Sequence, residues 1–331
     1  MLELIPKTNI DFVGKRYWYI GFTSAVLLSG VVSLVLKGGP RWGLDFTGGT
    51  LLEVKLQNPA HMEDVRKALR EKNAPPFEIQ SISGESIFLI RTKIDNAQGQ
   101  DAAKDAGKQI LAIVDQAYPN STLLRKEFVG PSVGKHLIRE TFYAFLLTFA
   151  GIIIYVAFRF SSGIWGASGV IALIHDVAAT VGVFSICNKE ITVTIVAALL
   201  TIAGYSINDT IVVFDRMREK LRLLRTEDLS VIVNQSINET LSRTIITSLT
   251  VMLVVLSLFF FGGEVIHDFA FAMLFGVFIG TYSSIAVAAP IVYEWVRIHN
   301  KSKQSQAFAK AAQAPKAAQN NNPKPVQAKK K

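Results

Sequence analysis

Long apolar stretches alternate with short charged connections along most of the chain, and this pattern predicts six membrane-spanning helices. An uncharged run of about 18 to 25 residues is long enough to cross roughly 30 Å of hydrocarbon as a helix. Four runs meet this condition, and two more do so with ionisable residues inside them, at His175, Asp176 and Asp209. The predicted spans are residues 17–37, 138–158, 164–187, 191–214, 241–263 and 268–296.

The charges between these spans predict their orientation. Lys15 and Arg16 precede the first span, Arg159 lies between the second and third, and the segment 215–240 after the fourth is basic and amphipathic. Because basic residues are enriched in cytoplasmic loops, we expect both ends of the chain, 1–16 and 297–331, in the cytoplasm. The second of these is rich in Ala, Gln, Asn, Lys and Pro without periodicity, which predicts a disordered tail. A solvated tail is favoured over one whose lysines contact membrane lipid.

Residues 38–137 replace the apolar runs with short alternating segments, which predict a folded domain outside the cytoplasm. The order βαββαβ is typical of the ferredoxin-like arrangement, in which two helices cover one face of a four-stranded antiparallel sheet. The predicted fold class is therefore a polytopic α-helical membrane protein with an α+β ferredoxin-like extracytoplasmic domain. Its strands and helices are expected at 50–57, 61–73, 77–82, 86–91, 102–117 and 122–129.

The composition supports a membrane class and argues against several other functions. Half of the residues are hydrophobic and only 18% are charged. The net charge of +9 comes largely from the connections and the tail, so we interpret it as topology and expect no nucleic-acid partner. Cys187 is the only cysteine, which excludes an intrachain disulfide and a cysteine-based metal cluster. The sequence also contains no HExxH, GxSxG or P-loop pattern, so we expect no enzymatic activity.

Asp209 and Arg243 are the ionisable pair of greatest interest, because a charge within hydrocarbon costs at least about 2.5–3.5 kcal/mol. Asp209 lies shortly before the end of the fourth span, and Arg243 lies near the start of the fifth. The two spans are consecutive and antiparallel, so we expect the side chains at similar depth, where they can pair. Burial favours the neutral acid and a guanidinium favours the carboxylate. The residues alone fit a proton-linked switch and a static ion pair equally well.

His175 and Asp176 lie nearer the middle of the third span, roughly 10 Å deeper than Asp209 on a rise of 1.5 Å per residue. At that depth they are not expected to pair with Arg243. They fit a second proton site, or a neutral hydrogen-bonded pair that fixes the register of the helices. The sequence does not separate these two interpretations.

A short segment with two adjacent glycines links the first span to the first predicted strand. Asp45, Thr47, Gly48 and Gly49 are its most distinctive residues. They can form a simple turn in which the aspartate binds backbone N–H groups. They can also form a joint that couples helix movement to the outer domain, and both alternatives remain open.

Five motifs in order along the chain resemble the SecD/SecF family of bacterial protein-export membrane proteins, which belongs to the resistance-nodulation-division (RND) superfamily. The resemblance covers about residues 15–297, which is nearly everything except the two ends. A match of five motifs distributed over six predicted spans is specific. The motifs occupy residues 42–50, 127–134, 172–177, 202–216 and 240–244.

The resemblance implies an RND-type half bundle that pairs with SecD in the bacterial cytoplasmic (inner) membrane. It further implies assistance to the SecY-SecE-SecG channel, with YajC and YidC as additional partners, in the export of unfolded preproteins. The energy source implied is the proton gradient, with no bound cofactor. In the family, the residues at the positions of Asp209 and Arg243 belong to the proton pathway, which favours the switch over the static pair.

Two other functions fit the sequence less well. An autonomous exporter of small molecules needs two six-span halves, whereas this chain holds one. An intramembrane aspartyl protease needs two carboxylates that face each other at one depth, and Asp176 and Asp209 are expected at different depths.

Overall fold

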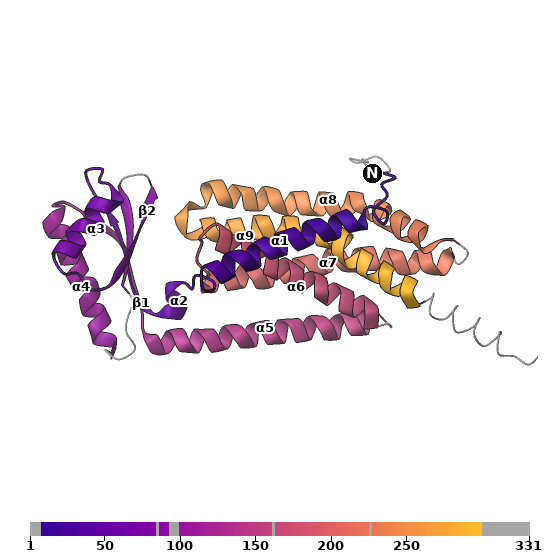
Figure 1. Cartoon of the computed structure of the whole chain (residues 1–331), viewed down its shortest axis with the longest axis horizontal. Coiled ribbons are helices and arrows are strands. Elements are labelled where there is room, and N and C mark those ends of the chain that lie inside the picture. Colours follow the sequence, from indigo (N-terminus) through magenta and orange to yellow (C-terminus); the bar gives the residue numbers. More distant parts are fainter. Residues whose placement is uncertain (1–7, 84–85, 93–98, 161–162, 225–226, 300–331) are drawn as a thin grey trace, which may run out of the picture.

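The molecule is an elongated helical bundle with a small sheet domain at one end (Figure 1). The computed structural model describes residues 8–83, 86–92, 99–160, 163–224 and 227–299. Within these residues, six helices are long and apolar enough to cross a membrane, which confirms the predicted fold class. They are α1 (Arg16–Leu36), α5 (Pro131–Arg159), α6 (Gly163–Ile186), α7 (Val193–Leu223), α8 (Leu229–Phe261) and α9 (Gly263–Ser283), the last continuing through a π-helical turn, η1 (Ser284–Ala288), to His299.

The sheet domain has the predicted ferredoxin-like topology. Its antiparallel strands lie in the order β2-β3-β1-β4, so the first and third strands are the two central ones. Leu52, Val54 and Ile90 of the central strands are buried and belong to one core cluster with Leu69 and Ile110 of the two helices. The elements are β1 (Gly49–Lys55), α3 (Met62–Glu71), β2 (Phe77–Ser83), β3 (Ile87–Thr92), α4 (Gly99–Ala117) and β4 (Thr122–Val129).

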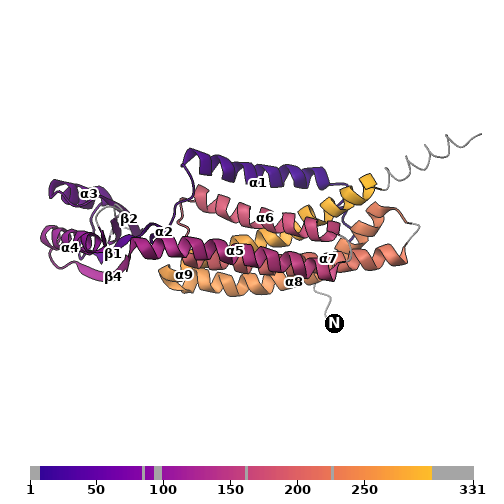
Figure 2. The ribbon, with the colours of Figure 1, turned by 90° about the horizontal axis from the view of Figure 1, so that it is seen from below.

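The middle of the bundle is formed by α6, α7 and α9, and the other helices lie around it. About half of the apolar window of each of these three helices is buried, against 6% for α1 and none for α5. Helix α1 lies along α6, where a Cβ added to Gly30 would come within 2.8 Å of the Cα of Gly182 (Figure 2). Glycine at both positions therefore permits the close approach of these two helices.

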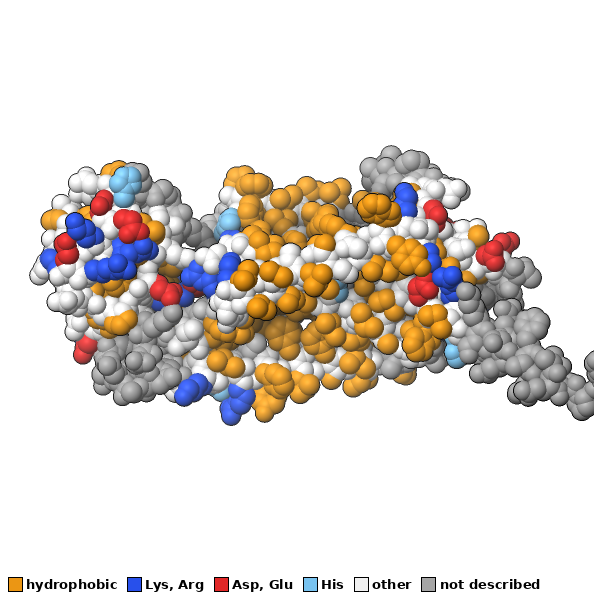
Figure 3. All heavy atoms as spheres, in the orientation of Figure 1, with side chains coloured by type: hydrophobic (Ala, Val, Ile, Leu, Met, Phe, Trp, Pro, Cys, Tyr) orange, Lys and Arg blue, Asp and Glu red, His pale blue; other side chains and the backbone are white. Residues whose placement is uncertain are grey.

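Hydrophobic side chains cover the helical bundle, whereas acidic and basic side chains gather on the sheet domain and at the opposite end (Figure 3). Many of the exposed apolar side chains belong to α1 and α5, including Leu28, Val32, Phe142 and Leu147. Such a belt between two charged ends is the distribution expected of a protein that spans a lipid bilayer.

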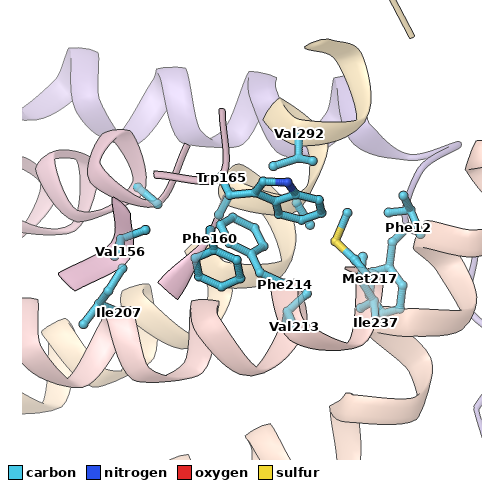
Figure 4. Close-up of a cluster of buried hydrophobic side chains, with 14 of the residues drawn as sticks. Phe12, Val156, Phe160, Trp165, Ile207, Val213, Phe214, Met217, Ile237 and Val292 are labelled. Atoms are coloured by element: carbon cyan, nitrogen blue, oxygen red, sulfur yellow. The ribbon is translucent and has the colours of Figure 1, made fainter. Parts of the chain in front are cut away.

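At the end far from the sheet domain, α7 and α8 continue beyond the spans predicted from hydropathy. Much of the segment 215–240, between the fourth and fifth predicted spans, belongs either to the end of α7 or to the start of α8. Phe12 packs there near Met217 and Ile237, and these side chains extend the aromatic cluster around Trp165 and Phe214 (Figure 4). The two helices therefore form a packed hairpin outside the apolar belt.

The chain before α1 is held on this hairpin by asparagine side chains. The backbone N–H groups of Phe12 and Val13 both donate to Asn234 Oδ1 at 2.9 Å. The carboxylate of Asp11 accepts from the N–H of Gly14 and from the Asn234 amide, each at 2.8 Å, and these bonds lower the pKa of Asp11. The tail was predicted to begin at position 297, but residues 297–299 still belong to the last helix, and the rest of the tail lies outside the described residues.

Candidate functional site

Asp209 lies where three helical elements meet in the bundle. Its Oδ1 accepts a hydrogen bond of 2.7 Å from Thr244 on α8, and its Oδ2 accepts one of 3.0 Å from Ser284 at the start of η1. A hydroxyl group donates to a carboxylate and can also accept from a carboxylic acid. The site can therefore keep hydrogen-bond partners for Asp209 in both protonation states.

Arg243 does not contact Asp209 directly. Its side chain is exposed, and among the described residues no ion pair of 4.0 Å or less joins it to the carboxylate. Successive residues on a helix point about 100° apart, so the inward direction of Thr244 turns Arg243 toward the outside of the bundle. The prediction considered the depth of Arg243 along its helix but not the direction in which its side chain points. Thr244 therefore occupies the position beside Asp209 that was expected for Arg243.

Asp176 is completely buried and has partners on three helices. Its Oδ1 lies 2.9 Å from Nδ1 of His175, and its Oδ2 accepts hydrogen bonds from Ser206 on α7 and, at 2.8 Å, from Ser283 on α9. His175 Nε2 is also buried and has no hydrogen-bond partner in the described part of the chain. The hydrogen-bonded histidine–aspartate pair is thus present, and its state of protonation remains a prediction.

The two carboxylates lie closer in depth than the predicted offset of roughly 10 Å. Asp176 binds Ser206, which precedes Asp209 by three residues, or about 4.5 Å along α7. Side chains on a helix tilt toward its N-terminus, and α6 and α7 are antiparallel, so the two aspartate side chains tilt toward each other. Adjacent residues, Ser283 and Ser284, then bind one carboxylate each.

Asp45 connects the entry of the sheet domain to the first turn of α7. It lies in a short helix, α2 (Leu44–Thr47), and its Oδ2 accepts from the backbone N–H of Val193 at 2.9 Å. The preceding residues pair with the α6–α7 loop, where Gly43 N donates to Ile191 O at 2.8 Å and Ile191 N donates to Arg41 O at 2.7 Å. Asp45 therefore binds a helix N-terminus, a favourable position for a carboxylate, rather than its own turn.

Thr47, Gly48 and Gly49 form the turn between this contact and β1. The hydroxyl of Thr47 donates to Gly43 O at 3.2 Å, which closes the short helix. Gly49 has a φ of 140°, and a Cβ there would lie 2.2 Å from Thr92 O on the neighbouring strand. The segment therefore contains both a turn and a contact with α7, and a role in coupling remains a prediction.

An ion-pair cluster between the α6–α7 loop and the sheet domain was not identified from the sequence. Glu190 pairs with Arg91 on β3 and lies 3.7 Å from Arg41, which is 3.9 Å from Glu78. Lys189 pairs with Asp268 on α9. Lys189 and Glu190 gave no sign of these contacts in the sequence, because their partners are distant in the chain.

The four hydroxyl residues that bind the carboxylates were also missed, because serine and threonine do not interrupt an apolar run. A signal was available, since small hydroxyl residues within a span commonly bond between helices. No group of three His, Cys, Asp or Glu residues that could hold a metal occurs in the described part of the chain. The four residues are Ser206, Thr244, Ser283 and Ser284.

Comparison with known proteins places these features in a family. The model of "Protein export membrane protein SecD/SecF, C-terminal" matches residues 109–298, and the "SecD/SecF GG Motif" matches residues 33–60, which include the turn at Gly48 and Gly49. The protein translocase subunit SecF of Endomicrobium trichonymphae is 45% identical over 89% of this chain and 94% of its own length. The SecF subunit of Escherichia coli O157:H7 is 40% identical over 85% of this chain and 86% of its own length.

Solved structures agree with the sequence matches. The crystal structure of SecDF from Thermus thermophilus, described as a translocon-associated membrane protein, superposes with a TM-score of 0.76 at 37% identity. The match covers 90% of this chain and 40% of that one. A second SecDF structure, in a super-membrane-facing form, gives a TM-score of 0.66 at 36% identity. The chain therefore belongs to the SecD/SecF family of protein-export membrane proteins, as a multi-pass SecF-type subunit that works in protein transport and not as an enzyme.

Proposed function

We propose that this subunit uses the proton gradient to assist export, with Asp209 as the group that takes up and releases the proton. The observation that carries the proposal is the setting of Asp209, which is bound by two hydroxyls from different helices and by no ion pair within the described residues. A change in its protonation changes the charge within the junction of α7, α8 and η1. It therefore changes which arrangement of these helices is most stable.

Arg243 enters the proposal as the alternative partner of Asp209. It follows Leu241 and Ser242 on α8 and is adjacent to Thr244, which holds Asp209 in this structure. Rotation of α8, or reorientation of the long arginine side chain, would bring its guanidinium toward the ionised carboxylate. Protonation of Asp209 would remove that attraction and favour the threonine contact. The protonation change thereby becomes a relative movement of α7 and α8.

Helix α7 is the element that carries this movement to the outer domain. Asp209 lies 16 positions, or about 24 Å along the helix, from Val193, whose N–H binds Asp45. A continuous hydrogen-bonded helix transmits a displacement over that distance with little loss. The contact of Asp45 with α7 and the turn at Gly48 and Gly49 then pass it to β1.

A SecD-type partner supplies the second half bundle in this proposal. Two observations support this partner. The match spans only 40% of the SecDF chain, and α1 and α5 leave apolar surfaces exposed. We further propose the SecY-SecE-SecG channel, YajC and YidC as neighbours and an unfolded preprotein as substrate. The orientation follows from the basic connections, with both ends of the chain in the cytoplasm and the sheet domain in the periplasm.

The test is the release of an exported polypeptide from membrane vesicles on which a pH gradient is imposed. Asp209→Asn keeps the size of the side chain and removes the titration, so we expect the gradient-dependent release to fall at least about tenfold, toward the level without a gradient. Asp105→Asn makes the same chemical change on the exposed surface of the sheet domain and should leave release unchanged. Full stimulation with Asp209→Asn, in a complex of normal abundance, would contradict the proposal.

A further inference from the structure

Four consecutive hydroxyl residues near the end of α9, Thr281 to Ser284, contact four different helices. We call them the hydroxyl run. Thr281 Oγ1 lies 2.6 Å from Ser248 Oγ on α8, and Tyr282 Oη lies 3.2 Å from Thr23 Oγ1 on α1. Ser283 donates to Asp176 on α6, and Ser284 donates to Asp209 on α7. One short stretch of backbone therefore touches both carboxylates and four helices, α1, α6, α7 and α8.

The two serines in the hydroxyl run each have a choice of acceptor. The hydroxyl of Ser283 lies 2.8 Å from Asp176 Oδ2 and 3.1 Å from the carbonyl oxygen of Gly280. The hydroxyl of Ser284 lies 3.0 Å from Asp209 Oδ2 and 3.0 Å from the carbonyl oxygen of Thr281. A serine hydroxyl has one proton to donate, so the charge on the carboxylate decides which acceptor it favours.

The backbone changes its geometry at the same place. The α-helical hydrogen-bond pattern of α9 ends at Ser283, and the π-helical turn η1 begins at Ser284. A π-turn leaves the regular i to i−4 pattern, and such turns occur frequently at functional sites. The carbonyl oxygens that the two serines can bind belong to the last α-helical turn before this change. The choice of acceptor is thus coupled to the geometry of the backbone.

We propose that Ser283 and Ser284 are positioning residues that couple Asp176 to Asp209, so that the two carboxylates respond to the proton gradient as one unit. This inference rests on the proposed function and adds a second carboxylate to it. A proton on Asp209 leaves Ser284 free to donate to Thr281 O and to accept from the new acid. Because Ser283 is its immediate neighbour on the backbone, the same adjustment changes the hydrogen bond to Asp176.

Other titratable or charged groups face these carboxylates and define what else can influence them. His175 binds Asp176 on its own helix, and Tyr282 belongs to the hydroxyl run. Tyr205 on α7 donates to Ser248, and Arg243 lies on α8 beside Thr244. Among the described residues, none of these groups bridges the two carboxylates as the adjacent serines do, so removal of the serine hydroxyls is the specific perturbation.

The experiment is a coupling measurement on the assembled complex in vesicles. The pH at half-maximal gradient-stimulated release is measured for the unchanged protein and for Asp176→Asn, and we expect a shift of at least about half a pH unit. The proteins with Asp176 and with Asp176→Asn are then compared in a background that carries both Ser283→Ala and Ser284→Ala. In this background we expect the shift in pH to disappear. Ser283→Thr with Ser284→Thr keeps both hydroxyls and should restore it.

Ser168→Ala is the matched control, because Ser168 is fully buried on α6 and donates only to the backbone carbonyls of Ile164 and Trp165. A shift that persists without the two serine hydroxyls would overturn the coupling. Absence of any shift with Asp176→Asn in the unchanged background would also overturn it. If the double alanine variant assembles poorly, the single variants Ser283→Ala and Ser284→Ala provide the same comparison. If either of these results overturned the coupling while Asp209→Asn still abolished gradient-dependent release, the proposed function of Asp209 would stand without it.

Discussion

At the scale of single residues, hydroxyl groups bind both of the aspartates within the helical bundle, and His175 also binds Asp176. Thr244 and Ser284 bind Asp209, and Ser206 and Ser283 bind Asp176. The aspartates were predictable because a carboxyl group is conspicuous in an apolar run. Their hydroxyl partners were not, because serine and threonine leave hydropathy nearly unchanged and the rotation of a helix is fixed only by packing. The outward position of Arg243 has the same cause.

Thr244→Val tests the hydrogen bond to Asp209 with almost no change in side-chain volume. The substitution leaves Asp209 Oδ1 without its donor, which should destabilise the folded protein by about 1–3 kcal/mol and lower gradient-dependent release. Thermal unfolding in detergent and the vesicle assay measure the two effects. Thr244→Ser keeps the hydroxyl and should behave nearly as the unchanged protein. Equal behaviour of the valine and serine variants would show that the hydroxyl is unimportant.

At the scale of secondary structure, apolar length predicted the existence of the spans better than it predicted their extent. The charges in 215–240 end an apolar run, but they do not end a helix, and α7 and α8 continue to Leu223 and back to Leu229. The π-turn η1 has no signature in the apolar pattern and was not predicted. The βαββαβ order of the sheet domain was predicted correctly, because strand alternation and helical periodicity are local properties.

A substitution at Asp45 tests the contact between α7 and the segment that leads into the sheet domain. Asp45→Ala removes the acceptor for the N–H of Val193 and should destabilise the start of α7 by about 0.5–2 kcal/mol. Faster hydrogen exchange at the first turn of α7, together with reduced gradient-dependent release, is the expected result. Asp45→Asn keeps an acceptor oxygen and serves as the control. Unchanged release despite faster exchange would argue against transmission through this contact.

At the scale of the whole molecule, the sheet domain is connected to the bundle by backbone pairing and by the ion pairs around Glu190. A parallel backbone bridge between Trp42 and Ile191 attaches the segment before β1 to the α6–α7 loop. Arg91 on the central strand β3 forms an ion pair with Glu190 in the same loop. The presence of a sheet domain was predictable from the sequence. Its attachment to the α6–α7 loop was not, because Arg91 and Glu190 are 99 positions apart and many other charges were available to each.

Glu190→Gln should loosen this attachment while leaving the sheet domain folded. The change removes the charge that faces Arg91 and Arg41, at a cost of up to about 3 kcal/mol, since the pair is largely shielded from solvent. Distances between spin labels on β2 and on the α8–α9 loop should become more widely distributed. The exposed pair of Lys67 and Glu71 offers a control, and Glu71→Gln should leave the distribution unchanged. An unaltered distribution with Glu190→Gln would show that backbone pairing alone holds the domain.

Asp209 should change its protonation state during gradient-driven export, and infrared difference spectroscopy measures this change directly. The carboxylic acid band of Asp209 is assigned by its loss in Asp209→Asn, in the complex assembled with its SecD-type partner in vesicles. We predict that the band appears and disappears as the pH on the sheet-domain side is changed across the working range. A band that stays constant, present or absent, while the gradient still stimulates release would contradict the account.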